Sequence, residues 1–220
     1  MPPRRRKTLP DPPETPPRRE PAPAVEPGAL WDGVEVGAEP AFPPVVADLD
    51  IRESRFAGAD LSGRRLPGLS LRDTAFERCD LSGAVLDGAV LDRVTFTACR
   101  LTGVVLSGTT LRDVRITDCR ADLANLRMAR ARFLLVEDSV LRGADLHEFA
   151  GSDVALLDCD LTGADLDRAD LTGARLHGST LDDVRGATSL RGARIGPEQQ
   201  VAVGAALLTA LGIQVTDRGD

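Results

Sequence analysis

The chain has 220 residues, a formal net charge of −7 and 42% hydrophobic residues, which is enough apolar material to bury a core. No apolar run approaches the roughly 18 residues that a membrane-spanning helix needs. The basic start MPPRRRK leads into prolines and acids, without the apolar segment of a signal peptide. We therefore expect a soluble, cytoplasmic protein.

The first segment is rich in proline and arginine, and residues 1–44 hold 13 of the 15 prolines. Such a sequence cannot bury enough apolar surface to offset the entropy lost on ordering. We expect residues 1–28 to be a disordered tail and residues 29–50, with Trp31, to fold back as an N-terminal cap. The basic cluster from Arg4 to Lys7 could contact nucleic acid or an acidic membrane, but residues 1–40 hold six basic residues against seven acids, so neither partner is expected.

From residue 51 to residue 181 a repeat centre, usually hydrophobic, recurs at every fifth position, in 27 consecutive positions of which three are small. On a helix such positions would lie about 140° apart, so they would form no stripe. On a flat strand an odd spacing would send successive side chains to opposite faces. The chain must therefore turn once in every repeat. The spacing is clearest at Leu161, Leu166, Leu171, Leu176 and Leu181.

Glycine marks the turn, because eleven of the twelve glycines between residues 51 and 181 lie two residues after a repeat centre, where a corner often needs a positive φ. Like residues also recur at multiples of twenty: Cys79, Cys99, Cys119 and Cys159, and Phe56, Phe76 and Phe96. Because like residues stack in a coiled chain, four repeats of five make one coil. Residues 51–195 are thus predicted to form an all-β, four-sided solenoid of about seven coils, on the order of 35 Å long.

These repeats resemble those of the pentapeptide repeat family, whose motif is A(D/N)Lxx. Close matches are GADLS at 58–62, GADLH at 143–147, GADLD at 163–167 and RADLT at 168–172. The resemblance implies a right-handed quadrilateral β-helix. Some members of the family bind DNA gyrase and topoisomerase IV by presenting an acidic rod of DNA-like width, which protects those enzymes from quinolones. In characterised members, C-terminal elements often support dimerisation.

After residue 181 the repeat slips by one residue, so that Leu190 and Ile195 are the last centres. Residues 196–220 then open with a predicted short helix, because Pro197 suits the first helical position, Glu198 the positive end and Gly212 the position after the helix. One face is expected to cap the last coil. The remaining apolar surface is available to a second copy, which predicts a homodimer through Val203, Leu207, Leu208 and Leu211.

The side chains that could carry chemistry do not form a recognisable site. The spacing of the cysteines matches no zinc motif, so we expect buried, reduced thiols, with disulfides between coils as the less favoured alternative. His147 and His177 are one and a half coils apart, which places them outward and solvated on opposite sides. No phosphate loop, nucleophile elbow or Ser/His/Asp arrangement is present. We expect no catalytic residues, metal or cofactor, and no enzymatic activity.

Charge changes sign along the predicted rod. Residues 51–132 carry 14 arginines and 10 acids, a balance of +4, whereas residues 133–183 carry 3 arginines and 12 acids, a balance of −9. We interpret the protein as a non-enzymatic interaction scaffold that uses the outer faces of a rigid rod. The alternative is a DNA-mimicking binder of gyrase or topoisomerase IV, and the acids could also serve solubility alone. The candidate acidic surface comprises Asp145, Asp160, Asp165, Asp167, Asp170, Asp182 and Asp183.

Overall fold

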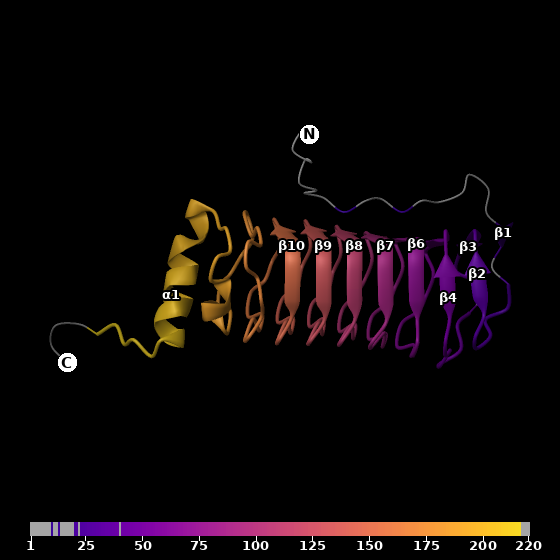
Figure 1. The fold of residues 1–220 in the computed structure, drawn as a ribbon, viewed down its shortest axis with the longest axis horizontal. Coiled ribbons are helices and arrows are strands. Elements are labelled where there is room, and N and C mark those ends of the chain that lie inside the picture. The colour runs from indigo at the N-terminus through magenta and orange to yellow at the C-terminus, as the bar shows by residue number, and fades with distance from the viewer. Residues whose placement is uncertain (1–9, 11–12, 14–19, 22, 40, 217–220) are drawn as a thin grey trace, which may run out of the picture.

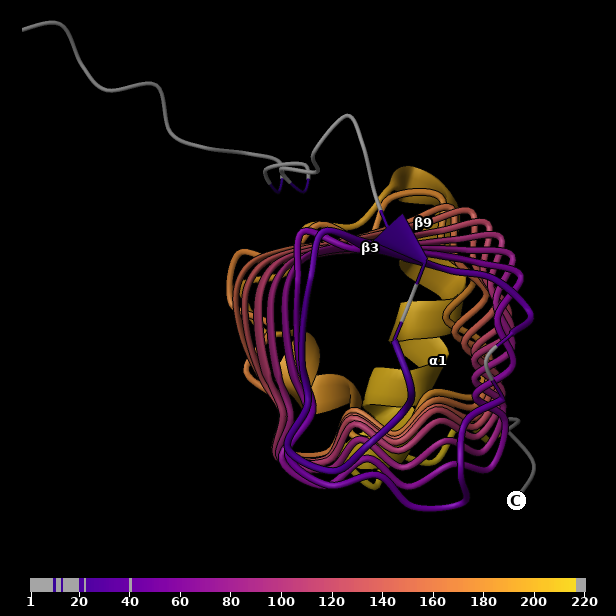
Figure 2. The ribbon, with the colours of Figure 1, turned by 90° about the vertical axis from the view of Figure 1, so that its right-hand side faces the viewer.

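The computed structural model describes residues 10, 13, 20–21, 23–39 and 41–216. The described chain winds into a rod of stacked coils that carries a helix at its C-terminal end (Figure 1). Along the rod axis the coils superimpose as a four-sided tube, and the helix lies across the far opening (Figure 2). The predicted all-β, four-sided solenoid is confirmed.

One parallel sheet of ten strands runs along the rod. The short strands lie at its N-terminal end: β1 (Glu20–Pro21), β2 (Leu30–Asp32), β3 (Val34–Val36), β4 (Asp50–Arg52) and β5 (Arg55–Ala57). The long strands follow: β6 (Ser70–Glu77), β7 (Val90–Thr97), β8 (Thr110–Thr117), β9 (Arg130–Glu137) and β10 (Ala150–Leu157). The order is β1-β3-β5-β6-β7-β8-β9-β10, and beside this path β4 pairs with both β2 and β6.

Neighbouring strands pair with an offset of twenty residues, as in Phe56 with Phe76 and Phe76 with Phe96. The sheet counts six coils from β4 and β5 to β10, and isolated bridges hold the coil after β10 in the same register. The last bridge joins Arg175 to Arg194, an offset of nineteen. The predicted slip of one residue after residue 181 is thereby confirmed.

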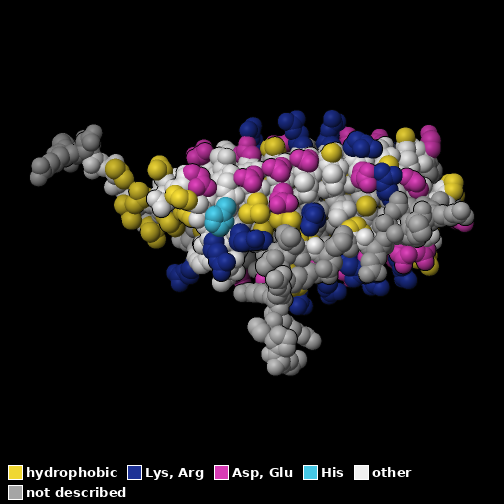
Figure 3. Space-filling model, turned by 90° about the horizontal axis from the view of Figure 1, so that it is seen from above, with side chains coloured by type: hydrophobic (Ala, Val, Ile, Leu, Met, Phe, Trp, Pro, Cys, Tyr) yellow, Lys and Arg dark blue, Asp and Glu magenta, His cyan; other side chains and the backbone are white. Residues whose placement is uncertain are grey.

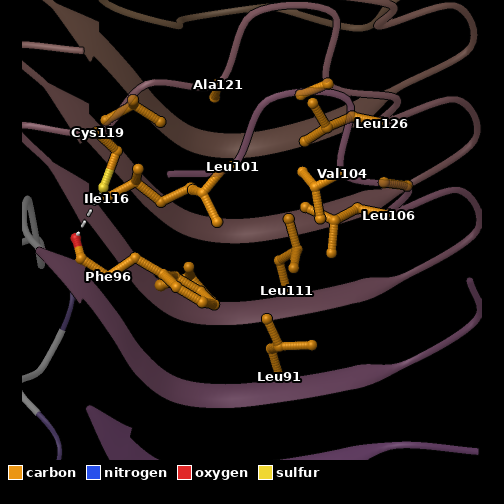
Figure 4. Packing of buried hydrophobic residues seen from close by; sticks show 14 of the residues in the cluster. Leu91, Phe96, Leu101, Val104, Leu106, Leu111, Ile116, Cys119, Ala121 and Leu126 are labelled. Atoms are coloured by element: carbon orange, nitrogen blue, oxygen red, sulfur yellow. Dashed lines mark hydrogen bonds between the residues drawn. The ribbon is translucent and has the colours of Figure 1, made fainter. Parts of the chain in front are cut away.

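The repeat centres fill the inside of the tube. Every centre from residue 51 to residue 181 is buried except Gly151, which is half-buried. The rings of Phe56, Phe76 and Phe96 stack with centroids 4.5 and 4.9 Å apart. Figure 4 shows the next step, where Ile116 continues the column of Phe96. Each coil thus buries its apolar side chains against the coils above and below, which is the source of stability in a solenoid.

The corners explain why glycine is frequent without being required. Every residue two positions after a centre, from residue 53 to residue 183, has a positive φ. Non-glycine residues also adopt it, including Asp113 at 54°, Met128 at 55° and Phe133 at 58°. Such conformations are uncommon for side chains of this size. The stacking of the coils therefore imposes the corner even where the local sequence disfavours it.

The region predicted as an N-terminal cap, residues 29–50, forms another coil in the same register. Trp31 pairs with Ile51 and is 1% exposed. Its ring lies 5.8 Å from that of Phe42 and 6.4 Å from that of Phe56, measured between centroids. The aromatic rings fill this end of the tube.

The predicted tail, residues 1–28, lies largely outside the described residues. Within it, Glu20 and Pro21 form β1 and pair with Val34 and Glu35 of β3. Val25 also packs against the core, and the Gly28 N–H donates to the carbonyl of Ala47 at 2.9 Å. The prediction of a disordered tail through residue 28 is therefore wrong for these four residues, the first two of which continue the sheet by one strand.

The C-terminal end contains η1 (Ala187–Leu190), η2 (Pro197–Gln199) and α1 (Gln200–Ala210). Pro197 begins the helical segment, and Gly212 beyond it has φ 68°, as the sequence predicts. The side chain of Gln199 joins α1 to the rod, because its Nε2 donates to the carbonyls of Leu176 and Ser179, each at 2.6 Å. Among the residues that the structure describes, no helix is long and apolar enough to cross a membrane.

Candidate interaction surfaces

The interior of the rod is filled, so the outside is where a partner can bind. The internal void between Leu101, Ile116, Ala121 and their neighbours measures ≈ 30 Å³. Ligand pockets commonly measure about 300 Å³ or more. The inside is therefore a packed core, and the candidate surfaces are the outward positions of each repeat and the C-terminal end.

Four of the seven predicted acidic-surface residues hold their own turns. Their carboxylate Oδ1 accepts a hydrogen bond from the backbone N–H two residues later, at 3.0 Å for Asp145 and Asp165 and at 3.1 Å for Asp160 and Asp170. The neutral Asn125 accepts the same bond from Arg127 at 3.0 Å. A side-chain oxygen at this position thus accepts the bond with or without a charge. The same turn also forms at the equivalent positions Val85 and Val105, which carry no such oxygen.

Arginines from other coils pair with three of these carboxylates. Asp145 lies 3.0 Å from Arg127, measured between carboxylate oxygen and guanidinium nitrogen, and Asp165 lies 3.1 Å from Arg185. Asp160 is paired with Arg142 at 2.5 Å. The pKa of Asp165 lies below its usual value, first because its carboxylate accepts the backbone hydrogen bond of Asp167 and further because Arg185 is close. These ion pairs reduce the negative charge that the acidic half presents to a partner.

The other four of the seven predicted acids have no arginine partner among the described residues and lie toward α1: Asp167, Asp170, Asp182 and Asp183. Asp182 and Asp183 line a groove of ≈ 420 Å³ between the last coil and α1, whose far wall includes Ala202 and Ala206. The twenty-residue register spreads the seven predicted acids over three of the four sides. The structure therefore does not bring them together as one surface.

The outer side of α1 and the segment after it are apolar. Val201 is 84% exposed, Leu211 63% and Val215 82%, and Ile213 is also exposed. In the view from above, hydrophobic atoms gather at the end that carries α1, while charges of both signs are mixed along the rod (Figure 3). We call Val201, Leu211, Ile213 and Val215 the apolar end.

The predicted dimer contacts need correction. Val203 is buried and Leu207 is partly buried, and both pack against the core of the rod, so they cap the last coil instead of facing a partner. Leu208 is half-buried, and Leu211 alone of the four is fully exposed. The sequence prediction missed Val201, Ile213 and Val215. Ile213 and Val215 follow the glycine after the helix, and hydrophobic residues at such positions could have indicated an exposed apolar surface.

The cysteines are free and buried, as expected from their inward positions. They form hydrogen bonds between coils: the Cys79 N–H donates to Sγ of Cys99 at 3.4 Å, and the Cys99 N–H donates to Sγ of Cys119 at 3.3 Å. Burial raises the pKa of Cys159 to about 11. Among the described residues, no group of three or more cysteine, histidine or acidic side chains is arranged to hold a metal ion.

The histidines lie on opposite sides of the tube, but only His177 is exposed. The prediction of a solvated His147 is wrong, because its side chain is 19% exposed and lies between two acids. Nδ1 of His147 is 3.5 Å from Asp167, and Nε2 is 3.6 Å from Glu148. The two histidines do not form a joint site.

Comparison with known proteins identifies the repeat. Residues 49–126 match the model of the family described as "Pentapeptide repeat region", and residues 152–185 match "Pentapeptide repeats (8 copies)". Together these matches cover about half of the chain. No curated protein matches it.

Several solved structures are similar. A trypsin-treated form of QnrB1, a plasmid-mediated fluoroquinolone resistance protein, is 20% identical, with 86% of this chain and 100% of that chain covered and a TM-score of 0.37. HetL, a pentapeptide repeat protein involved in heterocyst differentiation regulation in the cyanobacterium Nostoc sp. strain PCC 7120, is 19% identical, with 76% and 87% covered and a TM-score of 0.36. Rfr23, a pentapeptide repeat protein of the cyanobacterium Cyanothece 51142, is 16% identical, with 77% and 86% covered and a TM-score of 0.17.

Proposed function

Because the chain belongs to the pentapeptide repeat proteins, we propose that it is a non-enzymatic interaction scaffold. In this proposal a rigid rod contacts partner proteins through its outer faces and joins a second copy through its C-terminal end. The coil-to-coil hydrogen bonds and the buried centres fix the backbone, so the outward side chains form rigid surfaces that differ along the rod. Rigid surfaces of this kind lose little entropy when a partner binds.

The apolar end is the observation that carries the proposal. Four large hydrophobic residues that are each at least half exposed lie within fifteen residues of one another, on α1 and just after it. Clustered exposed apolar groups of this kind mark an interaction site, whereas isolated ones need no explanation. A second copy is the occupant that we assign, because the same surface on two rods would cover itself around a two-fold axis.

Photo-cross-linking of the purified full-length protein tests this assignment. A benzophenone amino acid at Val201, on the apolar end, is expected to give a covalent dimer on irradiation. The same group at Val90, an exposed position on β7, is the matched control and should give none. A dimer formed equally from both positions, or from neither, would contradict the proposal that the apolar end joins two copies.

Binding to DNA gyrase or topoisomerase IV is the second candidate function. It is favoured by the four acids without arginine partners in the last coils, since a two-fold contact at the apolar end would bring two such acidic regions close together. A supercoiling assay with purified gyrase, with and without a fluoroquinolone, tests it. The expected result is inhibition or drug protection by the wild type that is lost in the triple variant Asp170→Asn, Asp182→Asn and Asp183→Asn.

Substitution by asparagine removes the charge at all three positions and, at position 170, keeps a side-chain oxygen that can accept the N–H of Thr172. The matched control carries the same change of charge in the other half of the rod: Glu53→Gln, Asp87→Asn and Asp118→Asn. These three positions are exposed. Equal activity of wild type and both variants would remove the charge-based mechanism, and no effect of the wild type at micromolar concentration would remove gyrase as a target.

A further inference from the structure

Three arginines lie side by side on the outside of β8 and β9. The register pairs Arg112 of β8 with Arg132 of β9, and it pairs Arg130 of β9 with Thr110. All three arginines are exposed. Neighbouring strands lie about 4.8 Å apart, and alternate residues on one strand about 6.6 Å apart, so three guanidinium groups share one small area. We call Arg112, Arg130 and Arg132 the arginine face.

No carboxylate among the described residues forms an ion pair with these side chains. The acid next to Arg112 in the register is Asp92, which lies 3.8 Å from Arg72 and 3.5 Å from Arg93. Asp113 and Asp153, at nearby corners, have interactions of their own.

On the β10 side, the residues opposite Arg130 and Arg132 are the uncharged Ala150 and Ser152. Elsewhere on the rod, arginines such as Arg55 and Arg142 meet an acid from a neighbouring coil. The arginine face has no such acidic partner among the described residues. Its like charges lie directly opposite each other on a sheet, which is destabilising. Within the described chain, the guanidinium group of Arg132 lies 5.2 Å from the centroid of the Phe133 ring. Ion pairing within the fold therefore does not account for this cluster.

We propose that the arginine face binds an extended, acidic segment of a partner protein, with carboxylates at alternate positions. Side chains that point to the same side of an extended chain repeat every 6.8 Å or so, which matches the separation of Arg130 and Arg132. A guanidinium group binds a carboxylate through two parallel hydrogen bonds. A net charge of −7 opposes the long-range approach of nucleic acid, whereas a short peptide carries fewer charges to repel. This inference rests on the proposed scaffold function and names one class of partner for it.

Fluorescence anisotropy with the full-length protein and a labelled ten-residue peptide of alternating glutamate and serine tests the inference. The triple variant Arg112→Gln, Arg130→Gln and Arg132→Gln is expected to raise the Kd about tenfold or more, because it removes all three charge-assisted contacts. The single variant Arg132→Gln should give a smaller increase in the same direction. Circular dichroism checks that the variants keep the fold, and we expect a melting temperature no lower than that of the wild type.

The matched control changes the net charge equally on other sides of the rod, through Arg100→Gln, Arg142→Gln and Arg168→Gln. These three arginines have acidic partners and side chains of similar exposure. The control should leave the Kd within about twofold of the wild-type value, because only distant charges change. An equal loss of affinity in the control and in the arginine-face variant would show a net-charge effect and overturn the assignment of a site.

Two further probes separate the classes of ligand. A peptide with five glutamates followed by five serines should bind more weakly than the alternating peptide, and equal binding would overturn the predicted spacing. The second probe is a ten-nucleotide oligo(dT). If it binds more tightly than the peptide and depends on the same arginines, the ligand of the arginine face is nucleic acid and the proposal of an acidic protein segment is overturned. If the peptide does not bind but the benzophenone at Val201 still gives a covalent dimer, this inference is refuted and the scaffold proposal is not.

Discussion

At the scale of single residues, the repeat aspartates act first on their own backbone. Asp165 accepts a hydrogen bond from the N–H two residues later and pairs with Arg185 on the next coil. Asn125 occupies the equivalent position two coils earlier and makes the same turn without a charge. The sequence shows the acids and their abundance. It does not show their pairing, because this depends on which side chains the register places on neighbouring coils.

Substitution of Asp165 separates the two roles. Asp165→Asn keeps the turn and loses only an exposed ion pair, so the free energy of unfolding should fall by less than about 0.5 kcal/mol at pH 7. Asp165→Ala also removes the hydrogen-bond acceptor, and we expect a loss of about 1 kcal/mol. Urea unfolding measures both values. Equal losses in the two variants would show that the turn does not depend on the side-chain oxygen.

The pH dependence of the same variant follows from the lowered pKa of Asp165. A carboxyl whose folded-state pKa is below its ordinary value of 3.8 stabilises the fold above that value and loses this effect as the pH falls through the folded-state pKa. The stability advantage of the wild type over Asp165→Asn should therefore be constant above about pH 5 and shrink at lower pH. Melting temperatures from pH 7 to pH 2 test this, and an advantage that grows on acidification would contradict it.

The thiols give a prediction that depends on burial. All four cysteines are free and buried, and burial raises the pKa of Cys159 to about 11. Because all four thiols are buried in the tube, a thiol reagent cannot reach them and should modify none of the four within minutes at pH 8 in the folded protein. All four should react once the protein is unfolded in guanidinium. Fast reaction of even one thiol in the folded protein would mean that the rod opens locally at that coil.

At the scale of the elements, the coils and the helix could be predicted to different extents. The five-residue period and the twenty-residue recurrence specify the coil, because both are consequences of stacking. Pro197 and Gly212 specify where the helix begins and ends. The orientation of α1 could not be predicted, because Val201, Val203 and Leu211 are spread around a helix that has no strongly polar face. Only packing on the last coil shows that Val203 faces inward.

The link between α1 and the rod depends on Gln199, which sequence reasoning missed although it follows Ser179 by twenty residues. Its buried side chain satisfies two carbonyls of the last coil, and its Oε1 accepts the N–H of Gly196 at 2.6 Å. Gln199→Leu leaves these groups unsatisfied, so we expect a loss of about 2 kcal/mol and faster hydrogen exchange in residues 176–196. Gln200→Leu, at the exposed neighbouring position, is the control. Matching effects of the two substitutions would argue against the capping role.

At the scale of the whole molecule, the rod has three distinct outer regions: the arginine face at its middle, the acids without arginine partners in the last coils, and the apolar end. The sequence shows that the two halves of the rod differ in net charge. It does not show which charged side chains remain unpaired, because ion pairs between coils neutralise many of them. The apolar end is the region where exposed large hydrophobic side chains are concentrated. Two rods are therefore expected to join there.

Sedimentation equilibrium of the full-length protein at micromolar concentration tests this claim most directly. We expect a mass of twice 23.4 kDa for the wild type and 23.4 kDa for the double variant Val201→Asp and Leu211→Asp, with the melting of the rod nearly unchanged because both side chains are exposed. A wild-type protein that sediments at 23.4 kDa across this range, or a double variant that keeps the doubled mass, would contradict the account.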